Sequence, residues 1–341
     1  MNGTPYGFRI VGPCSGERRL INWWAAFNAY AACDERARCD AEAYLSGFTF
    51  DAAFRDYLTR TGSVKGFAGE CGAAFLWWDI DRDGSPDAAR TDAAKLALAI
   101  CDRFAVAEDD LLAFYSGSKG FHLGLPVSLW EPPPSADFHR IARRFCEAVA
   151  DAAGVAIDTG IYDAVRAFRA PNSRHPKTGL HKRRLPVEAL MHLDAAAIMD
   201  LAKTPEPFDV PTPPASGRCD WNIAADWNAA TEHVRGEAEA KASRRAAVAE
   251  GTAGPTLNRL TLAFIRNGAD TGDRHRLLYS AARNLGELRC PPALAVALLT
   301  ESALDSGLPP ADVRRQIECG LKDAVPSPAV PSPADGKGGA A

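Results

Sequence analysis

Short apolar runs and amphipathic stretches of helical period follow one another along the first half of the chain. The predicted strands are 73–81, Leu111–Tyr115 and Phe121–Leu125, and the predicted helices are 20–50, Asp92–Phe104 with Thr91 as its N-cap, and Phe138–Ala152. Continuous apolar runs bounded by glycine or charged residues are typical of buried strands, whereas Leu20, Trp24 and Phe27 recur at helical spacing. Because two strands are joined by a glycine turn, the pattern predicts an α+β fold rather than a doubly wound sheet.

The second half of the chain begins with a change in composition. A proline-rich stretch over 204–217 predicts an extended linker, and the Ala- and charge-rich stretch 222–250 predicts an exposed helix. Several short helices are predicted within 256–322, each opened by Pro or closed by Gly. We therefore expect a catalytic domain over 1–203, a linker and helix over 204–254, a C-terminal helical module over 255–323 and a disordered tail over 324–341.

Composition narrows the class of protein. The formal net charge of −4 over 341 residues argues against a protein that coats nucleic acid by overall charge, although a local basic patch is compatible with it. Nine scattered cysteines without a Cys-x-x-Cys pair predict reduced thiols, and the spacing of Cys33, Cys39 and Cys71 fits no standard zinc site. With no signal-like N-terminus and no apolar span of membrane length, a soluble cytoplasmic protein is expected.

Two aspartates interrupt the most apolar predicted strand, in the sequence FLWWDIDRDG over 75–84. Side chains alternate across a strand, so Asp79 and Asp81 share one face while Trp78 and Ile80 point to the other. Two adjacent carboxylates repel each other, and a divalent cation such as Mg²⁺ or Mn²⁺ would remove that repulsion. The alternative interpretation is a strand end followed by a turn at Asp81–Gly84.

A second group of polar residues lies in YSGSKGFHLGL, residues 115–125. Glycines allow backbone N–H groups to approach an anion, and Ser116, Ser118 and Lys119 surround them. His122 falls on the strand face opposite Phe121 and Leu123. This stretch predicts a phosphate-binding loop, with an ordinary Ser/Gly hairpin and a structural histidine as the alternative.

A basic block follows Asp158. It holds seven Lys or Arg residues and no acid, namely Arg166, Arg169, Arg174, Lys177, Lys182, Arg183 and Arg184. Solvated surface normally mixes both signs of charge, so this block is a candidate for binding a triphosphate or a nucleic-acid backbone. Within it, Arg169 and His175 suit a phosphate clamp and Lys177 adds positive charge, with a solvated loop as the alternative.

Together these segments predict a two-metal nucleotidyl-transfer site. Asp79, Asp81 and Asp158 would hold two Mg²⁺ or Mn²⁺ ions, while Ser116, Ser118, Lys119, His122, Arg169, His175 and Lys177 would bind a nucleotide. In such a site one ion lowers the pKa of a 3′-hydroxyl and the other bridges the phosphates of the incoming nucleotide.

The order of these segments resembles the archaeo-eukaryotic primase superfamily, which includes primase small catalytic subunits, primase-polymerases and the polymerase domain of bacterial end-joining ligases. The matching motifs are Asp79-Ile-Asp81, SGSKGFH over 116–122 and Asp158, followed by FRAPNSRHPKTG over 168–179. The resemblance implies an RRM-like catalytic sheet beside a smaller α/β unit, as well as template-directed synthesis from NTP or dNTP on single-stranded DNA. The helices of 256–322 are similar to the C-terminal module of phage and plasmid primases.

Some features depart from that pattern or leave alternatives open. The chain has no zinc module between the motifs and no Walker A sequence, so any helicase would be a separate protein. A non-catalytic replication initiator or DNA-binding module of the same fold is the main alternative, and another metal-dependent phosphoryl-transfer enzyme, such as a nuclease, is a third. Phe168 is a candidate for stacking on a template base. Several other residues are interpreted as core or solvated helix faces rather than DNA contacts: Trp23, Trp24, Trp221, Trp227, Arg266, Arg274, His275 and Arg276.

Overall fold

The structure is a computed structural model that describes residues 5–211, 221–249, 256–270 and 272–324. The chain divides into two compact units, Met1–Arg235 and Gly236–Ala341. Parts of the predicted linker, residues 212–220 and 250–255, and the predicted disordered tail from 325 onward lie outside the described residues. The fold is α+β, as predicted. In the described part of the chain, no helix combines the length and the apolarity needed to cross a membrane.

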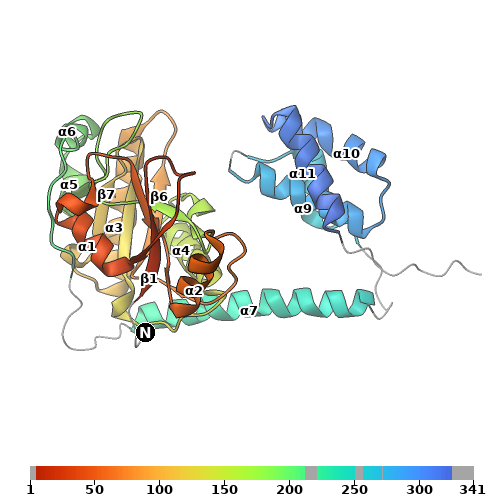
Figure 1. The fold of residues 1–341 in the computed structure, drawn as a ribbon, viewed down its shortest axis with the longest axis horizontal. Coiled ribbons are helices and arrows are strands. Elements are labelled where there is room, and N and C mark those ends of the chain that lie inside the picture. Colours follow the sequence, from red (N-terminus) through yellow and green to blue (C-terminus); the bar gives the residue numbers. More distant parts are fainter. Residues whose placement is uncertain (1–4, 212–220, 250–255, 271, 325–341) are drawn as a thin grey trace, which may run out of the picture. The chain divides into compact units, whose positions relative to one another are not determined.

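Two antiparallel sheets form the frame of the first unit (Figure 1). The first sheet contains β1 (Tyr6–Val11), β2 (Arg19–Asn22), β3 (Ala43–Ser46), β4 (Thr49–Phe50), β5 (Cys71–Gly72) and β9 (Ala167–Arg169), in the order β5-β4-β1-β3-β9 with β2 also paired to β1. The second contains β6 (Phe75–Asp81), β7 (Leu112–Tyr115), β8 (Gly120–Pro126) and β10 (Arg183–Leu185), in the order β10-β7-β8-β6.

The helices of the first unit are α1 (Trp23–Ala31), α2 (Ala52–Thr61), α3 (Pro86–Phe104), α4 (Phe138–Ala152), α5 (Val187–His192) and α6 (Ala195–Leu201), with a 3₁₀ turn η4 at Thr159–Tyr162. Shorter 3₁₀ turns are η1 (Glu35–Ala37), η2 (Glu108–Asp110) and η3 (Val127–Leu129). The helix α7 (Trp221–Ala249) begins in the first unit and passes the boundary at Arg235.

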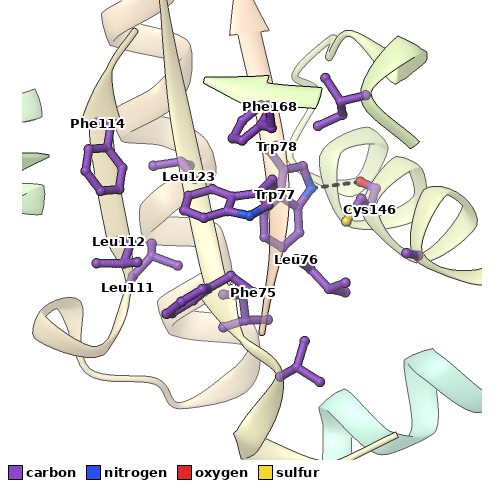
Figure 2. Packing of buried hydrophobic residues seen from close by; sticks show 14 of the residues in the cluster. Phe75, Leu76, Trp77, Trp78, Leu111, Leu112, Phe114, Leu123, Cys146 and Phe168 are labelled. Carbon is purple, nitrogen blue, oxygen red and sulfur yellow. Dashed lines mark hydrogen bonds between the residues drawn. The ribbon is translucent and has the colours of Figure 1, made fainter. Parts of the chain in front are cut away.

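The two faces of the second sheet have different partners. On one face, α3 and α4 cover the strands, and the buried Trp78 donates its indole N–H to the carbonyl oxygen of Cys146 in α4, 3.0 Å away (Figure 2). On the other face, Trp77 contacts Phe168 of the first sheet, with ring centroids 5.3 Å apart. The polar residues of β6 therefore lie on the face that meets the first sheet.

The predicted helix over 20–50 is wrong for most of its length. Only Trp23–Ala31 is α-helical, because Asn22 accepts a hydrogen bond from the Ala25 N–H and sets the start of α1, while Cys33 takes a positive φ of 51° just after its end. Flanking residues form β2, β3 and β4 instead. Trp23 is buried as interpreted, whereas Trp24 is 37% exposed and is not a core residue.

The helix α3 starts earlier than Thr91, its predicted N-cap. Ser85 is the N-cap, since its hydroxyl accepts a hydrogen bond from the Ala88 N–H, and Pro86 occupies the first helical position. Serine followed by proline is a helix-start signal that the apolar spacing alone did not reveal. The other predicted elements at Leu111–Tyr115, Phe121–Leu125 and Phe138–Ala152 are confirmed, the first two to within one residue at each end.

The second unit is helical, as predicted. Its described helices are α8 (Arg259–Asn267), α9 (Arg274–Glu287), α10 (Pro292–Asp305) and α11 (Pro310–Lys322). They enclose a separate core around Phe264, Leu278 and Leu299. Arg274 donates from Nη1 to the Ser306 carbonyl at 3.1 Å, which supports its interpretation as a structural residue.

The first turns of α7 belong to the core of the first unit. Trp227 is 5% exposed and lies against Phe138, Phe145 and Trp130, with ring centroids 4.9, 5.9 and 5.8 Å away. It therefore packs in the core, as the sequence indicated, and it attaches α7 to the fold.

We expect Trp227→Ala to lower the free energy of unfolding of the first unit by about 3–5 kcal/mol, because it leaves a large cavity among three aromatic rings. All seven tryptophans precede Arg235, so tryptophan fluorescence during urea unfolding reports on this unit. Asn228→Ala, at an exposed position on the same helix, is the matched control. If both variants lowered the free energy of unfolding by the same small amount, Trp227 would not attach α7 to the core of the first unit.

Candidate functional site

Antiparallel pairing of β6 with β8 places Asp79 directly opposite His122 and Asp81 opposite Gly120. The Nε2 atom of His122 lies 3.3 Å from Oδ1 of Asp79, and both side chains are largely buried, with 7% and 17% of their surfaces exposed. The strand face predicted for His122 is therefore confirmed. Register alone brings together two residues that are 43 positions apart in the sequence.

The charges around Asp79 decide its protonation state. Burial by itself would raise the pKa of Asp79, but the neighbouring His122, Lys182 and Arg166 outweigh burial and leave the pKa below its ordinary value. Burial, helped by Lys182, lowers the pKa of His122 although Asp79 opposes this shift. Asp79 is therefore ionised at neutral pH, and the Nε2 atom of His122 lies next to its carboxylate.

Asp81 has the opposite electrostatic character. Burial raises its pKa, the negative charges of Asp79 and Asp158 raise it further, and Lys119 only partly compensates. The Lys119 Nζ lies 3.5 Å from Oδ2 of Asp81 and also pairs with the exposed Asp83. A Cβ atom at Gly120 would lie 2.6 Å from the backbone carbonyl oxygen of Ile80 and would also overlap the Asp81 carboxylate, so glycine is required on the paired strand.

Asp158 lies at the edge of β6. Its backbone N–H donates to the Asp79 carbonyl oxygen at 2.9 Å, and its Oδ1 accepts from the Gly160 N–H at 2.7 Å at the start of η4. Its side chain is exposed, and its charge raises the pKa of Asp81 as described above. The structure therefore brings the three predicted aspartates to one edge of the second sheet.

Lys182 is a site residue that sequence reasoning did not single out. It is 1% exposed, its Nζ donates to the Arg169 carbonyl oxygen at 2.9 Å, and the ring centroids of Phe168, Trp77 and Phe114 lie 4.2, 4.9 and 4.9 Å from Nζ. Burial lowers its pKa well below the ordinary value, against the attraction of Asp79. In the sequence it is one of seven basic residues, and only burial distinguishes it from the others.

Phe168 is not available for stacking on a template base in this structure. Its ring is 9% exposed and lies 4.5 Å from the His122 ring and 5.3 Å from the Trp77 ring. Instead it forms one wall of the enclosure around Lys182 (Figure 2 shows Phe168 beside Trp77). The role predicted for Phe168 is thus replaced by a packing role.

The glycine loop of the β7–β8 hairpin contacts the basic block. Thr178 donates its hydroxyl hydrogen to the Gly117 carbonyl oxygen. The Ser116 hydroxyl oxygen accepts hydrogen bonds from the N–H groups of Gly120 and Ser118, at 3.2 and 3.4 Å, so this side chain shapes the turn. Ser118 is half-buried within the turn.

Arg169 and His175, the residues of the predicted phosphate clamp, influence each other electrostatically. Burial lowers the pKa of His175, and the nearby charge of Arg169 adds to this shift. The Nδ1 atom of His175 accepts from the N–H groups of Lys177 and Thr178, both at 3.3 Å, and the Lys177 side chain is exposed on that loop. The charge of Arg169 also reaches His122 and Lys182, lowering the pKa of each.

Donor chemistry favours a divalent cation at the three aspartates. Carboxylate oxygens are the ligands that Mg²⁺ and Mn²⁺ prefer, and a cation would relieve the repulsion from Asp79 and Asp158 that adds to the effect of burial on the pKa of Asp81. Within the described residues, however, no group of three or more His, Cys, Asp or Glu side chains is arranged to hold a metal ion. The eight described cysteines are free.

No protein-family model and no curated protein matches the chain. Among solved structures, the chain is similar to the polymerase domain of Mycobacterium tuberculosis ligase D in complex with DNA, with 16% identity and a TM-score of 0.32 over 56% of this chain and 69% of the other. It is also similar to the primase RepB′, with 11% identity and a TM-score of 0.34 over 94% of this chain and 90% of the other. At these values the likeness assigns no activity to the chain.

Replacing the buried Lys182 should show how much its burial lowers the free energy of unfolding. Between the lowered pKa of folded Lys182 and its ordinary value of 10.5, the unfolded state binds more protons, so wild-type stability rises with pH through that window. We expect Lys182→Met to increase the free energy of unfolding near neutral pH, and we expect this gain to shrink toward about pH 10.

Urea unfolding of wild type and variant across this pH range measures the difference. Lys95→Met, at an exposed lysine of α3, is the matched control. If the increase in the free energy of unfolding caused by Lys182→Met grew with pH, burial would not be the dominant influence on the pKa of Lys182.

Proposed function

We propose that this chain is a primase or primase-polymerase that performs template-directed nucleotidyl transfer from NTP or dNTP on single-stranded DNA. One observation carries the proposal: the three aspartates at the β6 edge lie beside the cations of the basic block and the hairpin loop. Asp79 is influenced by His122, Lys182 and Arg166, and Asp81 by Lys119. Adjacent carboxylates and clustered cations match the needs of a metal-bound triphosphate.

Asp79, Asp81 and Asp158 would hold two Mg²⁺ or Mn²⁺ ions. When bound, such ions lower the pKa of an attacking 3′-hydroxyl and neutralise the charge on the leaving pyrophosphate. Asp79 is suited to this role because its lowered pKa keeps it ionised. For Asp81, whose pKa is raised, the flexible Lys119 beside it can turn toward a phosphate once another cation neutralises the carboxylate.

The remaining residues of the site would bind and orient the triphosphate. Arg169 offers a planar guanidinium, and the enclosed Lys182 supports it by donating a hydrogen bond to the Arg169 carbonyl oxygen at 2.9 Å. His122 holds Asp79 in place through its 3.3 Å contact. His175, Lys177 and the glycine loop at 116–119 would line the outer part of the phosphate site.

A non-catalytic replication initiator of the same fold is the alternative. Such a protein would bind DNA without incorporating nucleotides, and it would have no need to keep ionised carboxylates next to bound phosphates, because like charges repel. The buried ionised Asp79 therefore favours the enzyme over the initiator.

We expect Asp79→Asn to reduce nucleotide incorporation by roughly 10²–10³-fold or more, since it removes a charge at the reacting centre while keeping the side-chain shape. Labelled NTP or dNTP would be supplied with single-stranded DNA and Mg²⁺ or Mn²⁺, without a primer and then with one. Asp56→Asn, at an exposed aspartate that pairs only with Arg55 among the interactions seen, is the matched control and should retain wild-type activity.

The outcomes separate the proposed functions. Unprimed products that disappear in Asp79→Asn would establish a primase, and products that need a primer would establish a polymerase. Undiminished synthesis by a folded Asp79→Asn protein would contradict this assignment of the site. Wild-type protein that binds DNA but forms no product under any of these conditions would favour the initiator.

A further inference from the structure

Tyr44 holds the side chain of Arg169. The two residues are directly paired between β3 and β9, so their side chains lie on the same face of the first sheet. Arg169 donates from Nη2 to the Tyr44 hydroxyl oxygen at 3.2 Å, and its guanidinium carbon lies 5.0 Å from the centroid of the Tyr44 ring. Both the ring and the hydroxyl therefore restrict the guanidinium.

Glu42 fixes the Tyr44 hydroxyl in turn. The Tyr44 O–H donates to Oε1 of Glu42, which gives a hydrogen-bond chain running in one direction from Arg169 through Tyr44 to Glu42. Burial raises the pKa of Tyr44 to about 12, with Glu42 adding to the shift and Arg169 opposing it, so the hydroxyl keeps its proton at neutral pH. The hydroxyl thus separates a carboxylate from a guanidinium that would otherwise attract each other directly.

One nitrogen of the Arg169 guanidinium makes no hydrogen bond to any described residue in this arrangement. Its Nη1 is buried and has no hydrogen-bond partner in the described part of the chain. A buried unpaired donor on a cation is costly, and an anion placed there would satisfy it. The charge of Arg169 already influences His122, Lys182 and His175, so this donor belongs to the cation cluster of the site.

We propose that Tyr44 is a positioning residue that keeps Arg169 free for the phosphates of a nucleoside triphosphate by holding Glu42 away from it. The inference rests on the proposed function and extends it to two residues, Tyr44 and Glu42, outside the motifs. Without the hydroxyl, Glu42 would pair with Arg169 directly and compete with the triphosphate for the same guanidinium.

Two variants distinguish this role from simple packing. Tyr44→Phe keeps the ring and removes the hydroxyl, and it should weaken triphosphate binding about tenfold, the scale of one hydrogen bond to a charged group. Adding Glu42→Gln to Tyr44→Phe removes the competing charge and should restore most of the lost affinity. Alone, Glu42→Gln should have little effect, because the amide oxygen can still accept from Tyr44.

Binding is measured directly and without chemistry, by titrating a nucleoside triphosphate and, in parallel, the corresponding nucleoside into wild type and variants. Tyr57→Phe is the matched control, since that hydroxyl also donates one hydrogen bond, to the Lys65 carbonyl oxygen, on the same unit. In a synthesis assay, Tyr44→Phe should raise KM about tenfold and leave kcat nearly unchanged.

The inference is supported if Tyr44→Phe alone weakens triphosphate binding and Glu42→Gln restores it. It is overturned if Tyr44→Phe binds the triphosphate as tightly as wild type, if the double variant shows no recovery, or if Tyr57→Phe loses as much affinity. Wild-type protein that binds no triphosphate at all would instead contradict the proposed function, and with it this inference.

Discussion

The structure depends on keeping one carboxylate ionised between two sheets. Asp79 is held there by His122 from the paired strand and by Lys182, which itself is enclosed by three aromatic rings. Burying a charge costs several kcal/mol unless another charge compensates it. Asp79 and Lys182 attract each other, and this attraction offsets part of the burial cost of both.

This compensation links the two sheets of the first unit. Lys182 immediately precedes β10 of the second sheet, yet its Nζ donates to the backbone of Arg169 in β9 of the first. Phe168 packs across the same gap against Trp77. The polar site and the aromatic core therefore share residues. A substitution in either would shift Lys182 and Arg169 relative to the three aspartates.

Local sequence patterns predict several elements of the fold correctly. The hairpin around residues 116–119 and the helix Phe138–Ala152 follow from apolar periodicity and glycine. The helix predicted over 20–50 is wrong on both sides of α1, where the residues pair as β2, β3 and β4. Strand pairing joins distant segments, so spacing within one segment does not reveal it.

For the site itself, the sequence alone determined which face of the strand carries Asp79 and Asp81 and which residues form the basic block, because side-chain alternation and charge are local properties. Only the tertiary structure decided that His122 lies opposite Asp79, that Lys182 is buried while Lys177 is exposed, and that Tyr44 supports Arg169. These positions depend on burial and on strand register between segments far apart in the chain. The desolvation and charge interactions that act on the buried groups arise only once the two sheets are packed together.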